Sequence, residues 1–178
     1  GPSSSHTAGA ARLARMAAEL VGQPFTHVEF GLHGSFAKTY RGHGTDVALV
    51  AGVLKIKEDD ELLKDAFRLA AEQGLTYRFY ETELSGAHEN TVCITFSMAN
   101  GKIREVVGSS VGGGQIKICK IDGFPLEMSL NMTTLLVLHR DAKGMIYRIT
   151  HSLADHEINI ATMRLTRQDT GAMQASVI

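Results

Sequence analysis

The sequence predicts an α+β protein, and three observations carry that prediction. Apolar residues recur at helical spacing within residues 13–20 and 59–73. Several short strand-like runs follow, and the dipeptides Asn100-Gly101 and Asp122-Gly123 are typical of the turns of β-hairpins. From residue 134 the order becomes strand, helix, strand, strand, which is that of the first four elements of a ferredoxin-like unit.

The first 130 residues are expected to hold two amphipathic helices and a shorter apolar one. The first helix ends near Gly22, and its apolar face consists of Leu13, Met16, Ala17 and Leu20. The apolar helix spans residues 47–54, and the second amphipathic helix spans 59–73 with Gly74 just beyond its end.

The strands of this domain are expected to form a mostly antiparallel sheet with the helices on one side. A glycine-punctuated loop is expected between the first strand and Asp46. The expected strands are residues 25–32, 76–81, 90–98 and 102–107, with a further pair flanking Asp122-Gly123.

Residues 134–178 are expected to form a second, smaller domain. Its helix ends near His156, and a turn is expected at residues 169–171. The closing helix and strand of a ferredoxin-like unit do not follow, and the first residue is Gly1, so we expect both ends to be truncated. The linker near 127–133 is short, so the two domains are expected to touch.

Composition argues against two classes of partner. Lys and Arg number 18 and Asp and Glu number 19, which gives a formal net charge of -1. No basic surplus is available to neutralise phosphates, so neither nucleic acid nor an anionic membrane surface is an expected partner. The apolar runs fall well short of the roughly 20 residues that span a bilayer, and we expect a cytoplasmic protein.

The two cysteines, Cys93 and Cys119, lack C-x-x-C spacing. An iron-sulfur cluster normally needs three or four thiolates, so this chain cannot hold one alone. Any cluster therefore belongs to another chain, and both cysteines are expected to be small buried apolar residues on strands.

A polar run, Ser3-Ser4-Ser5-His6-Thr7, lies just before the first helix. Unpaired backbone N–H groups and the positive end of the helix dipole favour an anion there, and a carboxylate would fit. The alternative is that one of the hydroxyls simply caps the helix.

The segment Gly42-His43-Gly44-Thr45-Asp46 places a histidine between two glycines, ahead of a helix. Glycines let a ligand approach the backbone, and an imidazole suits proton transfer near neutral pH, with Asp46 close enough to orient the ring. Alternatively, Thr45 or Asp46 caps the next helix and His43 only faces solvent.

These segments resemble the beta chain of bacterial iron-sulfur L-serine dehydratases over nearly the whole sequence. The matching motifs, in order, are G-P-S-S-S-H-T at 1–7, G-S-F-A-K-T at 34–39, G-H-G-T-D at 42–46, H-E-N-T at 88–91 and S-V-G-G-G at 110–114. The resemblance implies a fold similar to the allosteric-substrate-binding domain of some phosphoglycerate dehydrogenases, followed by an ACT domain. It also implies a partner alpha chain with a 4Fe-4S cluster, whose open iron acts as a Lewis acid while L-serine becomes pyruvate and ammonia.

The resemblance further implies roles for individual residues. His6 and His43 would face the partner's cluster, with His43 as the base that removes the Cα proton. The substrate carboxylate would be held by Ser4, Ser5 and Thr7. The family often has proline in the fourth motif, where this chain has Glu89, and no role is assigned to His88.

The second domain resembles the serine-regulated ACT domain of phosphoglycerate dehydrogenases. The segments H-R-D-A-K-G at 139–144 and N-I-A at 159–161 carry this resemblance. It implies that His139, Asp141 and Asn159 bind serine or another small amino acid across a homodimer interface. Asp141 replaces an asparagine of that family, which favours an effector's ammonium group or else a site that does not take serine.

Two other functions explain part of the sequence. A free-standing amino-acid sensor explains residues 134–178 but leaves His43 and the serine-rich run without a role. A purely structural subunit would tolerate alanine at position 43.

Overall fold

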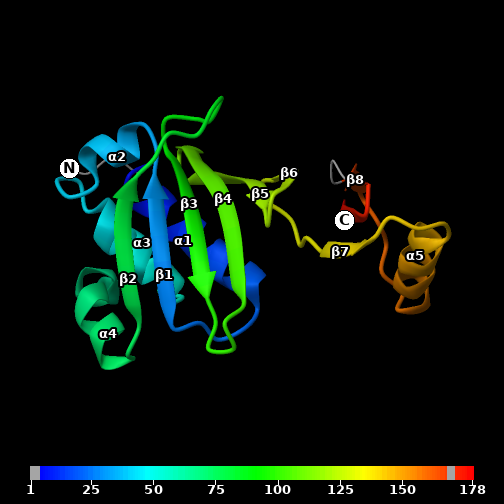
Figure 1. Ribbon diagram of the computed structural model, residues 1–178, viewed down its shortest axis with the longest axis horizontal. Coiled ribbons are helices and arrows are strands. Elements are labelled where there is room, and N and C mark those ends of the chain that lie inside the picture. The colour runs from blue at the N-terminus through cyan, green and yellow to red at the C-terminus, as the bar shows by residue number, and fades with distance from the viewer. Residues whose placement is uncertain (1–4, 168–170) are drawn as a thin grey trace.

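A computed structural model describes residues 5–167 and 171–178 of the chain. It contains a six-stranded sheet followed by a three-stranded sheet, with helices beside each (Figure 1). The prediction of an α+β fold is confirmed. No helix in the described ranges is long and apolar enough to cross a membrane.

The six-stranded sheet has the order β2-β1-β3-β4-β5-β6. Only β1 and β2 run parallel, and every other neighbouring pair is antiparallel, as predicted. The strands are β1 (His27–Leu32), β2 (Thr76–Glu81), β3 (Thr91–Ser97), β4 (Ile103–Gly112), β5 (Gln115–Ile121) and β6 (Phe124–Met128). β4 continues five residues beyond its expected end at residue 107. Register shifts at Val107/Gly108 and Ser110/Gly112 accommodate the glycines while β4 stays paired with β5.

Both predicted hairpins are present, but their turns differ. Asp122 and Gly123 have φ values of 47° and 81°, the pair of positive angles that a type I′ turn requires. In the other hairpin only Gly101 has a positive φ, at 82°, and the Asn100 side chain accepts a hydrogen bond from the Lys102 N–H. The Asn100-Gly101 hairpin therefore has no type I′ turn, since its longer connection has a positive φ at the glycine alone.

The helices of this unit lie on one face of the sheet, behind it in Figure 1. The core forms between them and the sheet, around fully buried side chains such as Leu13, Phe30 and Phe96. The helical elements are α1 (Ala8–Val21), α2 (Ser35–Thr39), α3 (Thr45–Val53), the 3-10 helix η1 (Glu61–Asp65) and α4 (Ala66–Glu72).

Close packing of α1 on α3 and β4 depends on two glycines. A Cβ at Gly52 would lie 2.4 Å from the Ala11 carbonyl oxygen, and one at Gly108 would lie 2.4 Å from Leu13 Cδ1. The alanine-rich face of α1 and these glycines bring the helix close to its neighbours, which fixes where its N-terminus lies.

Two helical predictions need correction. The segment expected as one helix at 59–73 is divided into η1 and α4, with the Asp60 side chain accepting a hydrogen bond from the Leu62 N–H at the start of η1. Apolar spacing does not separate a 3-10 turn from an α-helix over so few residues. The loop expected before Asp46 contains α2, whose five residues are too short to show helical periodicity.

The second unit has the predicted order of strand, helix, strand, strand. It consists of β7 (Leu136–Arg140), α5 (Met145–Asp155), β8 (Arg164–Arg167) and β9 (Met173–Val177), with β9 between β7 and β8. Of the turn expected at 169–171, residues 169 and 170 lie outside the described ranges. Leu136 and Val177 pack against the core of the first unit, so the two units touch.

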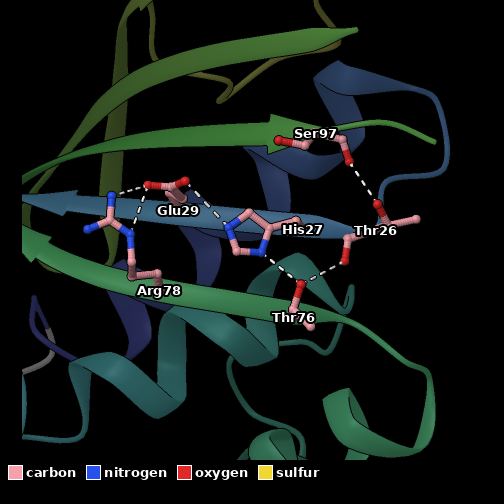
Figure 2. Close-up of polar contacts among 6 residues, drawn as sticks. All are labelled: Thr26, His27, Glu29, Thr76, Arg78 and Ser97. Carbon is pink, nitrogen blue, oxygen red and sulfur yellow. Dashed lines mark hydrogen bonds and ion pairs between the residues drawn. The ribbon is translucent and has the colours of Figure 1, made fainter. Parts of the chain in front are cut away.

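The face of the large sheet that carries no helix is polar. Figure 2 shows His27 and Glu29 of β1 beside Thr76 and Arg78 of β2. His27 Nδ1 lies 2.7 Å from Thr76 Oγ1, and Arg78 Nε donates to Glu29 at 3.1 Å. Cross-strand pairs of this kind are typical of a solvated sheet face.

Candidate functional site

The motif segments meet at one end of the six-stranded sheet. β1 ends at Leu32, β3 begins at Thr91, and the register pairs Thr91 with Ser109 of β4. The segments 33–46, 88–90 and 110–114 therefore leave the sheet at the same end. In Figure 1 this is the end that carries α2.

Two hydrogen bonds join the segment before α1 to the glycine-rich loop before α3. Thr45 Oγ1 donates to the His6 carbonyl oxygen at 2.8 Å, and Thr7 Oγ1 donates to the His43 carbonyl oxygen at 3.2 Å. The hydroxyls of Thr7 and Thr45 thus hold two segments together that are almost 40 residues apart in sequence.

These bonds bring two histidines side by side. The ring centroids of His6 and His43 lie 5.5 Å apart, with a tilt of 36° between the rings. His43 is exposed, whereas His6 is half-buried and packs edge-on against Phe36 at 5.6 Å. Burial, and then the charge of His43, lower the pKa of His6 below its usual value. The neutral form of His6 is therefore favoured, and His43 is the exposed ring that a ligand can reach.

Neither threonine caps the helix that it precedes or starts. Thr7, the N-cap residue of α1, makes no side-chain cap hydrogen bond because its hydroxyl donates to the His43 carbonyl oxygen, and the Thr45 hydroxyl donates to the His6 carbonyl oxygen. The simple helix-cap interpretation of these two threonines is wrong. Among residues 5–167 and 171–178 no side chain accepts from the first N–H groups of α1, and no acidic residue lies in that turn, which suits an anion.

Of the two serines expected to hold a carboxylate, the structure describes one. Ser5 is half-buried in the turn before α1, at the edge of the site. Ser4 lies outside the described residues. A carboxylate-binding role for Ser4, Ser5 and Thr7 stays a prediction.

Asp46 has a local role. Its Oδ1 accepts a hydrogen bond from the Val47 N–H at 2.9 Å, at the start of α3, where a negative charge suits the helix dipole. Within residues 5–167 and 171–178, the structure shows no hydrogen bond from Asp46 to the His43 ring. The backbone of His43 is held by two hydrogen bonds, one from Thr7 Oγ1 to its carbonyl oxygen and one from its own N–H to the Thr39 carbonyl oxygen, each 3.2 Å long.

Sequence reasoning assigned no role to Gly34 or Ser35, which link the site to the segment before β3. Gly34 has a φ of 61°, and a Cβ there would lie 2.5 Å from the Glu89 carbonyl oxygen. The Ser35 N–H donates to that same oxygen at 2.7 Å, and Ser35 Oγ lies 2.9 Å from His6 Nε2. A glycine directly before a serine at a helix start was the available signal.

His88 contributes mainly to the shape of its own turn. Its Nδ1 accepts from the Asn90 N–H at 3.1 Å, and its carbonyl accepts from Thr91 Oγ1 at 2.7 Å. The ring is exposed. The structure gives it no contact with His6 or His43 within the described ranges.

The described part of the chain does not offer ligands for an iron-sulfur cluster. No group of three or more His, Cys, Asp or Glu side chains among these residues could hold a metal ion. Cys93 on β3 is 7% exposed, and burial raises the pKa of its thiol to about 11, which disfavours the thiolate that metals bind. Cys119 lies on β5 and is also a free thiol.

The residues expected to bind an effector are dispersed in the second unit. His139 is 7% exposed, with Nδ1 at 2.9 Å from the Arg140 carbonyl oxygen and Nε2 at 2.8 Å from Ser176 Oγ. Asp141 pairs with Arg167 at 2.6 Å. Asn159 is exposed in the segment between α5 and β8. No hydrogen bond joins these three side chains within the described residues.

Known proteins are similar to this chain over most of its length. The family model "Serine dehydratase beta chain" matches residues 1–74. The L-serine dehydratase beta chain of Peptoniphilus asaccharolyticus is 44% identical over 92% of this chain and 74% of its own length. A probable L-serine dehydratase beta chain of Bacillus subtilis is 41% identical over 100% of this chain and 80% of its own. D-3-phosphoglycerate dehydrogenase of the same organism is 24% identical over 91% of this chain but 31% of its own length.

Proposed function

This chain belongs to the L-serine dehydratase beta chain family, and we propose that it completes the active site of an alpha chain that converts L-serine to pyruvate and ammonia. The observation that carries this proposal is the pairing of an exposed His43 with a half-buried His6, 5.5 Å apart at the end of the sheet where the motif segments meet. A scaffold subunit has no need of two adjacent imidazoles.

The reaction poses two chemical problems. The Cα proton of serine is weakly acidic, and hydroxide is a poor leaving group. A base solves the first problem and a Lewis acid the second. When bound by the partner alpha chain, a 4Fe-4S cluster supplies the Lewis-acid iron. This chain supplies the base.

His43 is the base in this proposal, and the geometry separates its role from that of His6. A base must reach the substrate, and His43 is exposed on a loop whose flanking glycines leave room for one. His6 is half-buried and engaged with Ser35, and burial, followed by the charge of His43, lowers its pKa, which favours the neutral ring. It serves as a neutral neighbour that does not compete for the proton.

The start of α1 is where this chain would hold the substrate's carboxylate. The helix begins beside both imidazoles, and its N-cap residue, Thr7, makes no side-chain cap hydrogen bond. In this proposal Ser4, Ser5 and Thr7 would also contact the carboxylate, and for Thr7 this would replace its hydrogen bond to the His43 carbonyl oxygen. A carboxylate there places the serine Cα within reach of the exposed His43.

Reconstitution tests the proposal. The alpha chain and this chain, purified without oxygen, are assayed for pyruvate and ammonia from L-serine, separately and together. We expect turnover only in the mixture, and no stoichiometric iron in this chain alone. About four irons per chain and pyruvate from this chain alone would overturn the division of labour, and an alpha chain as active alone as in the mixture would leave this chain no active-site role.

We also propose that the second unit is an ACT-like effector domain that forms homodimers and binds a small amino acid, serine first. The similarity to phosphoglycerate dehydrogenases supports this, because it covers 88–91% of this chain and therefore includes much of the second unit. Asp141 would meet the effector's ammonium group, with His139 beside it and Asn159 from the second copy. Binding would compete with the Arg167 pair of Asp141 and the Ser176 contact of His139.

A further inference from the structure

The backbone at Ser35 is fixed on both sides. Its N–H donates to the Glu89 carbonyl oxygen at 2.7 Å, and its own carbonyl oxygen accepts from Thr39 Oγ1 at 2.7 Å. The preceding Gly34 approaches the Glu89 backbone too closely for any side chain. The Ser35 hydroxyl is thus presented to His6 from a rigid helix start, at 2.9 Å from Nε2.

The other ring nitrogen of His6 decides the direction of this hydrogen bond. A neutral imidazole has one N–H and one acceptor nitrogen. Nδ1 of His6 is buried and has no hydrogen-bond partner among the described residues. A buried N–H without a partner is rarer in proteins than an acceptor without one. This contrast favours the tautomer in which Nδ1 is unprotonated and Nε2–H donates to Ser35 Oγ.

We propose that Ser35 is a positioning residue that holds neutral His6 in the Nε2–H tautomer and fixes the orientation of its ring toward His43. As the acceptor, Ser35 keeps its own hydroxyl hydrogen free to donate to another group. This inference rests on the proposed function only for its catalytic consequence, because the tautomer is a property of this chain alone.

The surroundings of His6 are consistent with a neutral ring. Phe36 of α2 meets it edge-on, Thr45 of α3 donates to its carbonyl, and the titratable group that faces it is His43. No carboxylate is paired with His6 in the described residues, so nothing favours its protonation. Burial and the charge of His43 both lower the pKa of His6.

Imidazole nitrogen NMR on the isolated, ¹⁵N-labelled chain tests the tautomer directly. In the wild type we expect Nε2 of His6 to carry the proton and Nδ1 to be unprotonated. Ser35→Ala should move the His6 signals toward a mixture of tautomers, and Ser35→Thr, which keeps a hydroxyl, should restore them. His27, at the other end of β1, is the internal control and should not move (Figure 2). A proton on Nδ1 in the wild type, or unchanged His6 signals in Ser35→Ala, would overturn the proposal.

The reconstituted enzyme separates this inference from the proposed function. Ser35→Ala should lower kcat roughly 10-fold or more, since a His6 ring in the wrong tautomer and orientation disturbs proton transfer at the neighbouring His43, and Ser35→Thr should recover most of the loss. If wild-type complex shows no serine dehydratase activity, the proposed function fails while the NMR result still stands. If the tautomer changes and kcat does not, Ser35 does not act through His6 in catalysis.

Discussion

His6 and His139 are both shielded histidines that lie in family motifs, but they differ in what their ring nitrogens contact. His139 is 7% exposed, and both nitrogens have partners, the Arg140 carbonyl and the Ser176 hydroxyl. His6 has one partner, Ser35, and a second nitrogen with none among the described residues. A fully engaged ring stabilises its surroundings, whereas a partly engaged ring next to an exposed imidazole has the arrangement of an active site.

The two units also differ in how their candidate residues are arranged. At the end of the large sheet, Thr7 and Thr45 tie separate segments together and place His43 beside His6. In the second unit, Asp141 and His139 are each paired with other residues of the same chain. The residues of the first group are brought together within one chain, whereas effector binding as proposed would need both a rearrangement and a second copy.

The largest expected effect is on His43. In the reconstituted enzyme, His43→Ala should lower kcat by about 10²- to 10⁴-fold, the usual contribution of a general base. Assembly with the alpha chain and iron content should change little, because the His43 side chain is exposed. Steady-state kinetics with L-serine, together with iron analysis of the complex, measure both effects.

A matched control for this variant is His27→Ala. His27 lies at the opposite end of β1, on the polar sheet face, and its loss should leave kcat within about twofold of the wild type, because it can reach no reacting atom. If His43→Ala itself stays within roughly threefold of the wild type, it is not the base. His6 then becomes the better candidate for the base, and the roles proposed for His6 and His43 are exchanged.

The second-largest expected effect concerns His139, whose two ring nitrogens both have hydrogen-bond partners. His139→Ala should destabilise the protein by about 2–3 kcal/mol, because it removes two hydrogen bonds and leaves the buried Ser176 hydroxyl without a partner. Urea unfolding measures the loss. The control, His151→Ala on the exposed side of α5, should cost less than about 0.5 kcal/mol. A cost for His139→Ala no greater than that of the control would mean that its contacts do not stabilise the unit.

Local chemistry predicts much of the fold. The Asp122-Gly123 turn was predictable because two successive positive φ values suit that dipeptide. The ends of β2 at Thr76 and Glu81 were predicted to the residue. The short helix α2 was not predicted, since its five residues are fewer than two helical turns and show no helical periodicity.

The histidines of the site were identified from their motifs, but their contacts were not. Nothing in the sequence places His6 against Ser35, because the register of β1, β3 and β4 decides which loops meet. The expected partnership of Asp46 with His43 has no counterpart in the hydrogen bonds described, where Asp46 binds the adjacent backbone of α3. Tertiary contacts of this kind do not follow from spacing.

A third, smaller effect tests effector binding. Serine should bind the protein with saturable heat, and Asn159→Ala should weaken this binding about fivefold, the effect of losing one hydrogen bond of about 1 kcal/mol. Isothermal calorimetry on both variants measures this. Saturable binding unaffected by Asn159→Ala would place the effector elsewhere, and no heat in either would leave the second unit an assembly role only.

The smallest expected effect is the pH dependence that His6 contributes to stability. Its pKa is lowered in the folded protein, by burial first and the charge of His43 second, from an ordinary value of 6.5. The unfolded chain therefore binds this proton more readily than the folded one, and the folded protein should lose stability as pH falls below about 6.5.

His6→Gln removes the group, so urea unfolding at pH 5, 6 and 7 should show a flatter pH dependence of stability than in the wild type. His43→Gln removes only the second cause and should give an intermediate slope. If wild type and His6→Gln lose stability in parallel over this range, His6 is not held neutral by its surroundings, and its contrast with His139 rests on hydrogen bonding alone.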